Sequence, residues 1–600
     1  MSYTPAGVLA TLPRTQRGCA LVLSGDPKGK NFVYTNGQSV IVRDIADPSI
    51  ADVYTQHAVQ TTVARYAPSG FYIASADVSG KVRIWDTTNA EHILKYEYPC
   101  LGGPIKDLQW SPDSKRIVVV GEGREAFGRV FLWDSGSSVG EIQGHSKTIN
   151  TVDYRPTRPF RIVTGGDDFA LSILHGPPFK FNTNMRVHKR FVNSVRYAPN
   201  GEQFFSAAQD GKMFLWDGKS GDQVAEFTDG ENAHKGGIYA ASWNGDGTRI
   251  LTASGDKTCK IWDVESRSVV NTFEIGKNVD DQQLGCLWQG DYLLSVSLSG
   301  VINYLDPASN SVSRVVRGHS KNITTFSISE DRNQFFTGSY DSSTMSWNSA
   351  SSECKPLSGS GHSNGVQNIS IAGGNFVSCA MDDTVRFAEL PAEVPEFKTS
   401  VKMPSCPADT AATKDGYTVV ACVDEVVLMK DCAIVSSVKT DYQPTAIGIR
   451  EKTKEVVVGA KDNNLRLFKV DGNQLSFVRD ITTMVGEPTC IVFADDQEHF
   501  AVGSGAREVG LFNANTFTLV RAAAVNHTAR VTDIAFSPDS KRFASSSLDT
   551  NVYVWNVENE NKIKIGHAHP LSTITGLVWM SNTQLASSGS DCCIRKWNIE

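Results

Sequence analysis

Several features that mark common protein classes are missing from this sequence. No stretch of the 600 residues approaches the roughly 20 apolar residues that a membrane-spanning helix needs. The N-terminal segment has no charged region followed by an apolar run, so we expect no signal peptide. Neither a phosphate-binding loop nor a dinucleotide-binding fingerprint occurs. We therefore expect no membrane association and no nucleotide or other cofactor.

Basic charge and paired cysteines are also scarce. The formal net charge is −7, which gives no general electrostatic reason for binding nucleic acid. The 12 cysteines show no CxxC spacing, and the chain is far too long to depend on a disulfide scaffold. This usage indicates reduced thiols and a cytoplasmic protein, with no metal site.

An internal repeat dominates what is present. Each unit has a histidine, an apolar strand, a second strand, a turn with aspartate, and a third strand that ends near Trp-Asp. This pattern is typical of WD repeats, in which each unit supplies one four-stranded blade of a β-propeller. The clearest third strands end at Trp85, Trp133, Trp216, Trp262, Trp347, Trp555 and Trp597.

Less regular copies fill the gaps between these units. Their third strands are predicted to end at Ile45, Leu174, Leu305, Ala388, Met429, Phe468 and Phe512. The fourteen units average about 43 residues of the 600, as expected for this repeat. We therefore predict an all-β protein with two seven-bladed propellers. The N-terminal propeller should cover residues 17–317, and the C-terminal propeller residues 318–600 plus a strand at 5–13.

The strand at the N-terminus follows from how such rings close. In WD propellers the start of one repeat supplies the outer strand of the preceding blade, but the last repeat ends at Trp597 with nothing after it. The segment Gly7–Leu12 is an unassigned strand at the other end of the chain. We predict that it pairs as the outer strand of the final blade, because that blade otherwise exposes an edge.

Histidine and aspartate recur at fixed distances from the tryptophans. Such residues can form a hydrogen-bonded network with a serine or threonine of the second strand, which satisfies buried polar groups and fixes the turn. We therefore interpret them as structural. The predicted pairs are His188 with Asp210, His234 with Asp256, His319 with Asp341, His527 with Asp549, and His567 with Asp591.

One segment matches an enzyme motif. Gly361-His-Ser-Asn-Gly365 fits the GxSxG pattern of a nucleophile elbow, which needs a turn from a strand into a helix. Here it coincides with the Gly-His loop of a repeat, so we predict no catalytic residue. His567 and His569 lack the further ligands of a metal site.

Binding surfaces are expected where loops exceed what the fold requires. Residues 121–128 form a longer turn than the matching 255–258, and the next unit lacks its tryptophan. Phe179, Phe181 and Phe191 follow, interleaved with Lys180, Lys189 and Arg190. Aromatic anchors with a charged rim are typical of protein-binding sites. The alternative is that one or two of these phenylalanines fill the space between blades.

Four segments resemble a known family. Residues 12–18, 29–40, 121–128 and 176–181 resemble the actin-interacting protein 1 family along the full chain. The resemblance implies a cytoplasmic, monomeric, non-catalytic protein of actin structures. Such a protein enhances disassembly of filaments decorated by actin-depolymerising factor/cofilin, by severing or monomer release, with end capping left open. The partner-binding residues implied are Glu125, Asp167, Lys180, Phe181 and Phe191. A WD-repeat scaffold of another multiprotein complex is the alternative.

Overall fold

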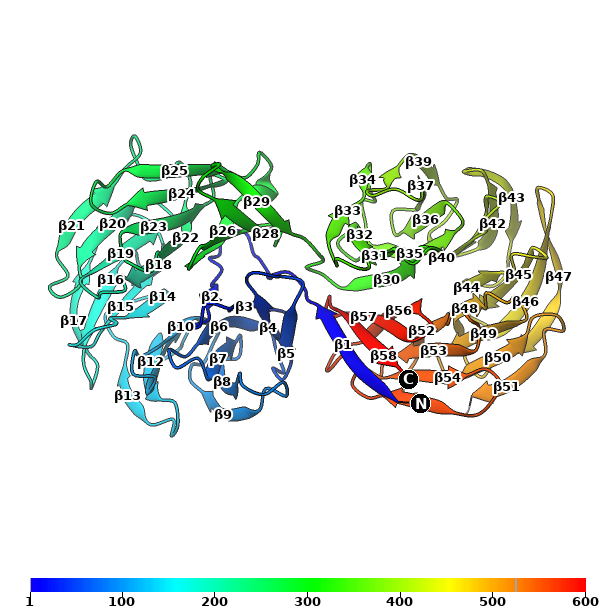
Figure 1. Ribbon diagram of the computed structural model, residues 1–600, viewed down its shortest axis with the longest axis horizontal. Helices are drawn as coiled ribbons and strands as arrows, with labels where there is room; N and C mark the ends of the chain where they lie inside the picture. Colours follow the sequence, from blue (N-terminus) through cyan, green and yellow to red (C-terminus); the bar gives the residue numbers. More distant parts are fainter. Residues whose placement is uncertain (1, 524–525) are drawn as a thin grey trace. The chain divides into compact units, whose positions relative to one another are not determined.

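The computed structural model describes residues 2–523 and 526–600. Within these ranges the regular structure is antiparallel β-sheet, apart from one two-stranded parallel pair and the short 3-10 helix η1 (Val279–Asp281) (Figure 1). The predicted all-β class is thus confirmed. In the described part of the chain, no helix has the length and apolar character needed to cross a membrane.

The chain divides into two compact units. One comprises residues 12–317, here called the first ring, and the other comprises residues 1–11 with 318–600, here called the second ring. The described residues of the first ring form seven four-stranded sheets, which cover residues 24–54, 61–99, 105–141, 149–185, 192–227, 238–274 and 283–316. Those of the second ring form seven more, which cover residues 323–356, 366–402, 407–439, 444–483, 488–523, 531–565, and 574–599 with 3–9.

Within each unit the sheets form a closed ring. The first strand of each sheet contacts the first strand of the next, as β14 (Ile149–Tyr154) contacts β10 (Ile105–Trp110) and β18 (Val192–Tyr197). In the second ring, β30 (Ile323–Ile328) of the first blade contacts β56 (Ile574–Ser581) of the last blade. Each unit therefore has the arrangement of a seven-bladed propeller, with the first strand of every blade innermost.

The first ring closes in the same way, through its innermost strands. β2 (Ser24–Gly25) of its first blade contacts β26 (Gln283–Gln289) of its seventh blade. All seven of its described sheets are built from consecutive strands, so each blade is a contiguous segment of the chain.

The second ring takes its closing strand from the other end of the chain. β1 (Tyr3–Leu9) pairs antiparallel with β58 (Ile594–Ile599), with Tyr3 opposite Ile599 and Leu9 opposite Ile594. Leu9 is buried, and the Tyr3 ring lies edge-on to Trp597 at 6.1 Å. The predicted outer strand of the last blade is confirmed, although it begins and ends a few residues earlier than Gly7–Leu12.

Apolar side chains fill the layers between neighbouring blades. In the first ring, Val118 and Val130 of the third blade pack against Ile149, Tyr154 and Leu174 of the fourth. The strands that supply them are buried on both faces, because each blade is covered by a blade on either side.

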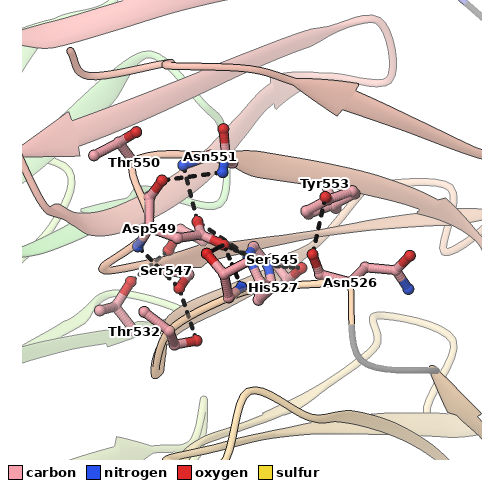
Figure 2. A network of polar contacts seen from close by, with 12 residues as sticks. Asn526, His527, Thr532, Ser545, Ser547, Asp549, Thr550, Asn551 and Tyr553 are labelled. Carbon is pink, nitrogen blue, oxygen red and sulfur yellow. Dashed lines mark hydrogen bonds and ion pairs between the residues drawn. The ribbon is translucent and has the colours of Figure 1, made fainter.

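The predicted polar networks fix the turns between second and third strands. In the sixth blade of the second ring, His527 Nδ1 lies 3.1 Å from an Asp549 carboxylate oxygen, and its Nε2 lies 2.9 Å from Ser545 Oγ (Figure 2). Trp555 Nε1 donates to the same hydroxyl at 2.9 Å. The pairs His188–Asp210 and His234–Asp256 are confirmed by equivalent bonds. The carboxylate, the imidazole and the indole thereby have hydrogen-bond partners within the protein although they lie away from water.

Two predicted pairs differ in the structure. His569, not His567, bonds Asp591 at 3.0 Å and Ser587 at 2.9 Å. His567 lies in a turn with φ +50° instead, two residues too early to reach the aspartate. His319 bonds Ser343 at 3.0 Å, and that serine in turn donates to Asp341, so this pair is indirect.

Networks also form in blades where none was predicted. His57 bonds Asp77 and Ser75, His145 bonds Asp168 and Thr164, and His362 bonds Asp382 and Ser378. The last two blades lack the tryptophan, which shows that histidine and aspartate can hold the turn without it.

Candidate partner-binding site

The turn of the fourth blade of the first ring carries the candidate residue Asp167. It joins β15 (Arg161–Gly166) to β16 (Leu171–His175). Asp168 Oδ1 lies 2.9 Å from His145 Nδ1, while Asp168 Oδ2 accepts the Ser146 N–H at 2.9 Å. Burial alone would raise the pKa of Asp168, but these hydrogen bonds lower it below its ordinary value. The turn is therefore held rigidly against the loop that precedes the innermost strand.

Asp167 and Phe191 meet at one place on this rim. Asn150 Nδ2 donates to Asp167 Oδ1 at 2.7 Å and to the carbonyl of Val192, next to Phe191, at 3.2 Å. Both Asp167 and Phe191 line a cavity of about 470 Å³ in the first ring. Asp167 is half-buried, whereas Phe191 keeps 40% of its surface exposed. An oriented acid and an exposed aromatic ring thus lie side by side.

A third residue of this rim, Phe169, was missed by the sequence analysis. Its ring lies 5.7 Å from that of Phe191 at an angle of 39°, and 36% of its surface is exposed. Its φ is +66°, a conformation that costs a non-glycine residue about 1–2 kcal/mol. The signal was available, because Gly211, Lys257 and Thr550 follow the network aspartate in other blades. The same turn position also has a positive φ where Lys257, Ser342 and Thr550 occupy it, so this conformation belongs to the repeat, and the exposed aromatic ring is what distinguishes this blade.

Lys180 and Phe181 begin β17 (Lys180–Met185), the outer strand of the same blade. Phe181 is 41% exposed, and its ring lies against Gly144, where an added Cβ would come within 2.5 Å of Cε2. Gly144 directly precedes His145, so Phe181 borders the loop that holds the Asp168 turn. Lys180 is exposed at the start of the strand.

Phe179 proves to be the phenylalanine that fills the space between blades. It is only 3% exposed and packs edge-on to Tyr154 at 5.6 Å. Of the three aromatic residues singled out in the sequence, Phe181 and Phe191 therefore remain on the surface.

Glu125 lies on the longer turn of the third blade. This turn covers residues 122–127, between β11 (Arg116–Gly121) and β12 (Gly128–Leu132), whereas the sixth blade needs only 255–257. Glu125 is exposed. Another residue of the turn, Glu122, lines the same cavity as Asp167 and Phe191. The turn thus extends the acidic side of the rim.

The cavity wall below the rim contains paired charges. Asp107 is buried and lies 3.0 Å from both Arg65 and Arg196. Burial favours the neutral acid, but Arg196 and Arg65 outweigh it and lower the pKa of Asp107. Asp153 accepts hydrogen bonds from Gln109 and from the Tyr197 N–H, yet burial still raises its pKa. These groups join the innermost strands of neighbouring blades.

The remaining candidate chemistry falls within the repeat framework. Ser363 of the GxSxG segment donates its N–H to Asp382 at 2.9 Å, in the loop before the strand β35 (Val366–Ala372). Among the described residues, no group of three or more His, Cys, Asp or Glu side chains has the arrangement of a metal site.

Comparison with known proteins agrees with this architecture. The "WD domain, G-beta repeat" family model matches residues 50–86, 136–173, 179–217, 222–263, 310–348, 521–556 and 560–598. The chain is 47% identical over 605 residues to WD repeat-containing protein 1 of Xenopus tropicalis, covering all of both chains. It is 46% identical over 604 residues to actin-interacting protein 1 of Drosophila melanogaster, covering 100% of this chain and 98% of that one. The chain belongs to the actin-interacting protein 1 family of WD-repeat proteins.

Membership in the actin-interacting protein 1 family accounts for the segments that the repeat does not demand. The family model matches seven segments, whereas the structure contains further blades with degenerate repeats, such as those at residues 407–439 and 444–483. The full-length similarity to family members covers these blades as well.

Proposed function

We propose that the protein binds actin filaments decorated by actin-depolymerising factor/cofilin and promotes their disassembly. The observation that carries the proposal is the rim of the first ring. There Phe169 and Phe191 are exposed as a pair next to Asp167, on turns that hydrogen bonds hold in place. The name of the Drosophila relative, actin-interacting protein 1, supports actin as the partner.

The chemistry of this rim suits a protein partner. Exposed aromatic rings that become desolvated on binding supply much of the affinity of an interface, whereas charges at its edge tune orientation and association rate. Because the turns are already held by the His145–Asp168 network, little conformational entropy would be lost on binding. Glu125, Lys180 and Phe181 would extend the contact along the third and fourth blades.

Disassembly requires only selective binding. A ligand shifts an equilibrium by as much as its affinity differs between the two states. A platform that binds the cofilin-altered filament more tightly than the bare filament therefore favours the altered state and the loss of subunits from it. A preference of about 1.4 kcal/mol gives a tenfold difference in affinity. In this proposal the protein acts without catalysis or a cofactor, as a cytoplasmic monomer at actin structures.

Sedimentation of filaments tests the proposal. We expect the wild-type protein to release actin to the supernatant when filaments are saturated with cofilin, and to release far less without cofilin. Phe191→Ala should weaken filament binding by about 2 kcal/mol or more, and Asp167→Ala by less. Phe191→Ala should keep the wild-type melting curve, because exposed substitutions rarely exceed about 0.5 kcal/mol. Asp167→Ala should lose no more than about 1 kcal/mol, because Asn150 keeps its hydrogen bond to the Val192 carbonyl.

A matched control is Leu519→Ala, which removes a similarly exposed apolar side chain from the outer strand β51 (Leu519–Ala523) of the second ring. It should disassemble filaments as the wild type does. If Phe191→Ala and Asp167→Ala were as active as this control, the site would lie elsewhere. Activity that does not depend on cofilin would refute the proposed selectivity.

A further inference from the structure

The turn between the second and third strands starts at an equivalent position in most blades. The N–H of the residue after the second strand donates to a carbonyl just before the innermost strand of the same blade. In the first ring Asp167 donates to Thr148 at 2.9 Å, and in the second ring Tyr340 donates to Asn322 at 3.0 Å. We call this the first turn residue. The shared bond places such residues on the same face of each ring.

Four first turn residues of the second ring are large, apolar and exposed. They belong to the first, second, third and sixth blades and are Tyr340, Met381, Val423 and Leu548, with exposed fractions of 58%, 40%, 44% and 43%. Met381 and Leu548 make the same backbone bond as Tyr340, and Val423 likewise follows the end of its second strand.

The seventh blade continues this set from a neighbouring loop. Its first turn residue is Ser590, but Leu571, in the loop before its innermost strand, is 63% exposed. Because the ring is closed, blades six, seven, one, two and three are consecutive. We call Tyr340, Met381, Val423, Leu548 and Leu571 the apolar arc.

One shared residue connects two neighbouring members of the arc, Tyr340 and Met381. The Tyr340 ring lies against Gly365, where an added Cβ would be 3.3 Å from Cδ2. The Gly365 carbonyl accepts the Met381 N–H at 2.9 Å. Tyr340 and Met381 therefore border the same residue, which connects the arc across the first and second blades.

The propeller framework does not require apolar residues here. The first ring has Glu122, Asp167, Gln209 and Gly255 at the first turn position, with the same backbone bond. Its two apolar residues at this position, Val78 and Leu298, are half-buried and not exposed. Apolar side chains grouped on one exposed surface indicate an interaction site, whereas single ones do not. The arc is thus a property of the second ring and not of the repeat.

Carboxylates beside the arc give it a charge preference. Asp341, Asp383 and Asp424 follow Tyr340, Met381 and Val423 within two positions. Within residues 2–523 and 526–600, none of the three forms an ion pair with a lysine, arginine or histidine. His319, nearest to Asp341 in its network, bonds Ser343 instead. Lysine or arginine side chains of a binding partner could therefore form ion pairs with these three carboxylates.

We propose that the apolar arc binds a protein segment that carries apolar side chains flanked by lysine or arginine. The apolar groups would cover Tyr340, Met381 and their neighbours, while the basic groups would lie near Asp383 and Asp424. This interaction is separate from filament binding by the rim of the first ring, since it uses residues of the other ring.

Fluorescence anisotropy with the full-length protein tests the proposal. The probe is a labelled amphipathic peptide composed of leucine and lysine, and the comparison is its counterpart composed of leucine and glutamate. We expect the leucine–lysine peptide to bind at least tenfold more tightly. The double variant Tyr340→Ser/Met381→Ser should lose at least tenfold in affinity while keeping the wild-type melting curve.

The matched control is Leu519→Ser/Val520→Ser, which removes two apolar residues with 51% and 54% exposure from an outer strand. It should bind the peptide as the wild type does. An equal loss in this control, equal binding of the leucine–glutamate peptide, or no binding of either peptide would overturn the proposal.

The carboxylates are tested separately. Asp383→Asn/Asp424→Asn should weaken leucine–lysine binding several-fold at low salt and have little effect at high salt, because exposed charges are screened. If the variant bound the leucine–lysine peptide as tightly as the wild type at low salt, the proposed preference for a basic partner would be wrong. Phe191→Ala should bind the peptide normally, so failure of this proposal and failure of the filament proposal would be distinguishable.

Discussion

The two rings close differently. Each described sheet of the first ring is a contiguous segment, so its seven blades need no exchange of strands. The last sheet of the second ring has the order β1–β58–β57–β56, where β57 is Gln584–Gly589, and its outer strand comes from the start of the chain. The stability of the second ring therefore depends on residues 3–9, whereas that of the first ring does not.

The inner walls of the rings differ as well. In both rings an aspartate of an innermost strand accepts an N–H from the next blade, as Asp107 does from Val152 and Asp409 from Ile447. Asp107 has two arginine partners. Asp409 and Asp533 are half-buried in the inner wall, and no cation pairs with either within the described residues, so desolvation raises the pKa of both to about 7. At the same structural position, the pKa of the aspartate is therefore lowered in the first ring and raised in the second.

Removal of the closing strand should have the largest effect. Deleting residues 2–9 takes away a seven-residue strand and the buried Leu9, and should destabilise the second ring by at least about 3 kcal/mol. Hydrogen–deuterium exchange should show faster exchange in β58 and its neighbours, with the first ring unchanged. Equal acceleration in both rings would contradict the difference in closure.

The polar networks provide a second contrast. Asp256 accepts bonds from His234, Lys235 N–H and Thr258, so Asp256→Ala should destabilise the first ring by about 1–3 kcal/mol. Asp341 has no direct bond to His319, and Asp341→Ala should cost the second ring less than about 1 kcal/mol. Denaturant unfolding followed by exchange in each ring would compare them. Equal losses would show that the direct histidine bond is unimportant.

The sequence predicted the framework because the repeat is a periodic signal. Every predicted third strand ends within three residues of a strand end in the structure, even where tryptophan is missing. The orphan segment at the N-terminus was assigned correctly for a simple physical reason: an unpaired edge needs a partner.

Two features were missed although the sequence carries a signal for them, and a third becomes visible only in the structure. His569 was passed over for His567 although the spacing distinguishes them, because the other four predicted pairs are 22 residues apart and His569 stands 22 residues before Asp591. Phe169 was missed although alignment of the turns shows it, because Gly211, Lys257 and Thr550 stand at the equivalent position in other blades. The apolar arc was missed because Tyr340 and Leu548 are more than 200 positions apart and become comparable only through the same backbone bond.

The half-buried acids predict a pH effect in the second ring. Unfolded aspartate titrates near pH 4. Because the folded pKa of Asp409 and Asp533 is raised, the folded ring binds more protons between about pH 4 and 7. Their contribution to stability is complete below about pH 4 and is lost as the pH rises through about 7. We expect the second ring to lose about 1 kcal/mol or more over this range.

The variant Asp409→Asn/Asp533→Asn tests this assignment. The amide oxygen can still accept the N–H groups of Ile447 and Leu577, so the ring should fold. Its stability should fall less steeply with pH than that of the wild type, as measured by hydrogen exchange at matched temperatures. An unchanged slope in the second ring would assign the pH dependence to other groups.

The variant Phe169→Gly tests whether Phe169 and Phe191 serve binding and not the fold. Glycine adopts positive φ without strain, so the free energy of unfolding of the first ring should stay level or rise by up to about 1 kcal/mol. Affinity for cofilin-saturated filaments, measured on the same preparation, should fall at least tenfold. Lys257→Gly, at the equivalent position with φ +72°, should leave affinity unchanged. A Phe169→Gly protein that binds filaments as the wild type does, or that is destabilised, would contradict this role for the aromatic pair.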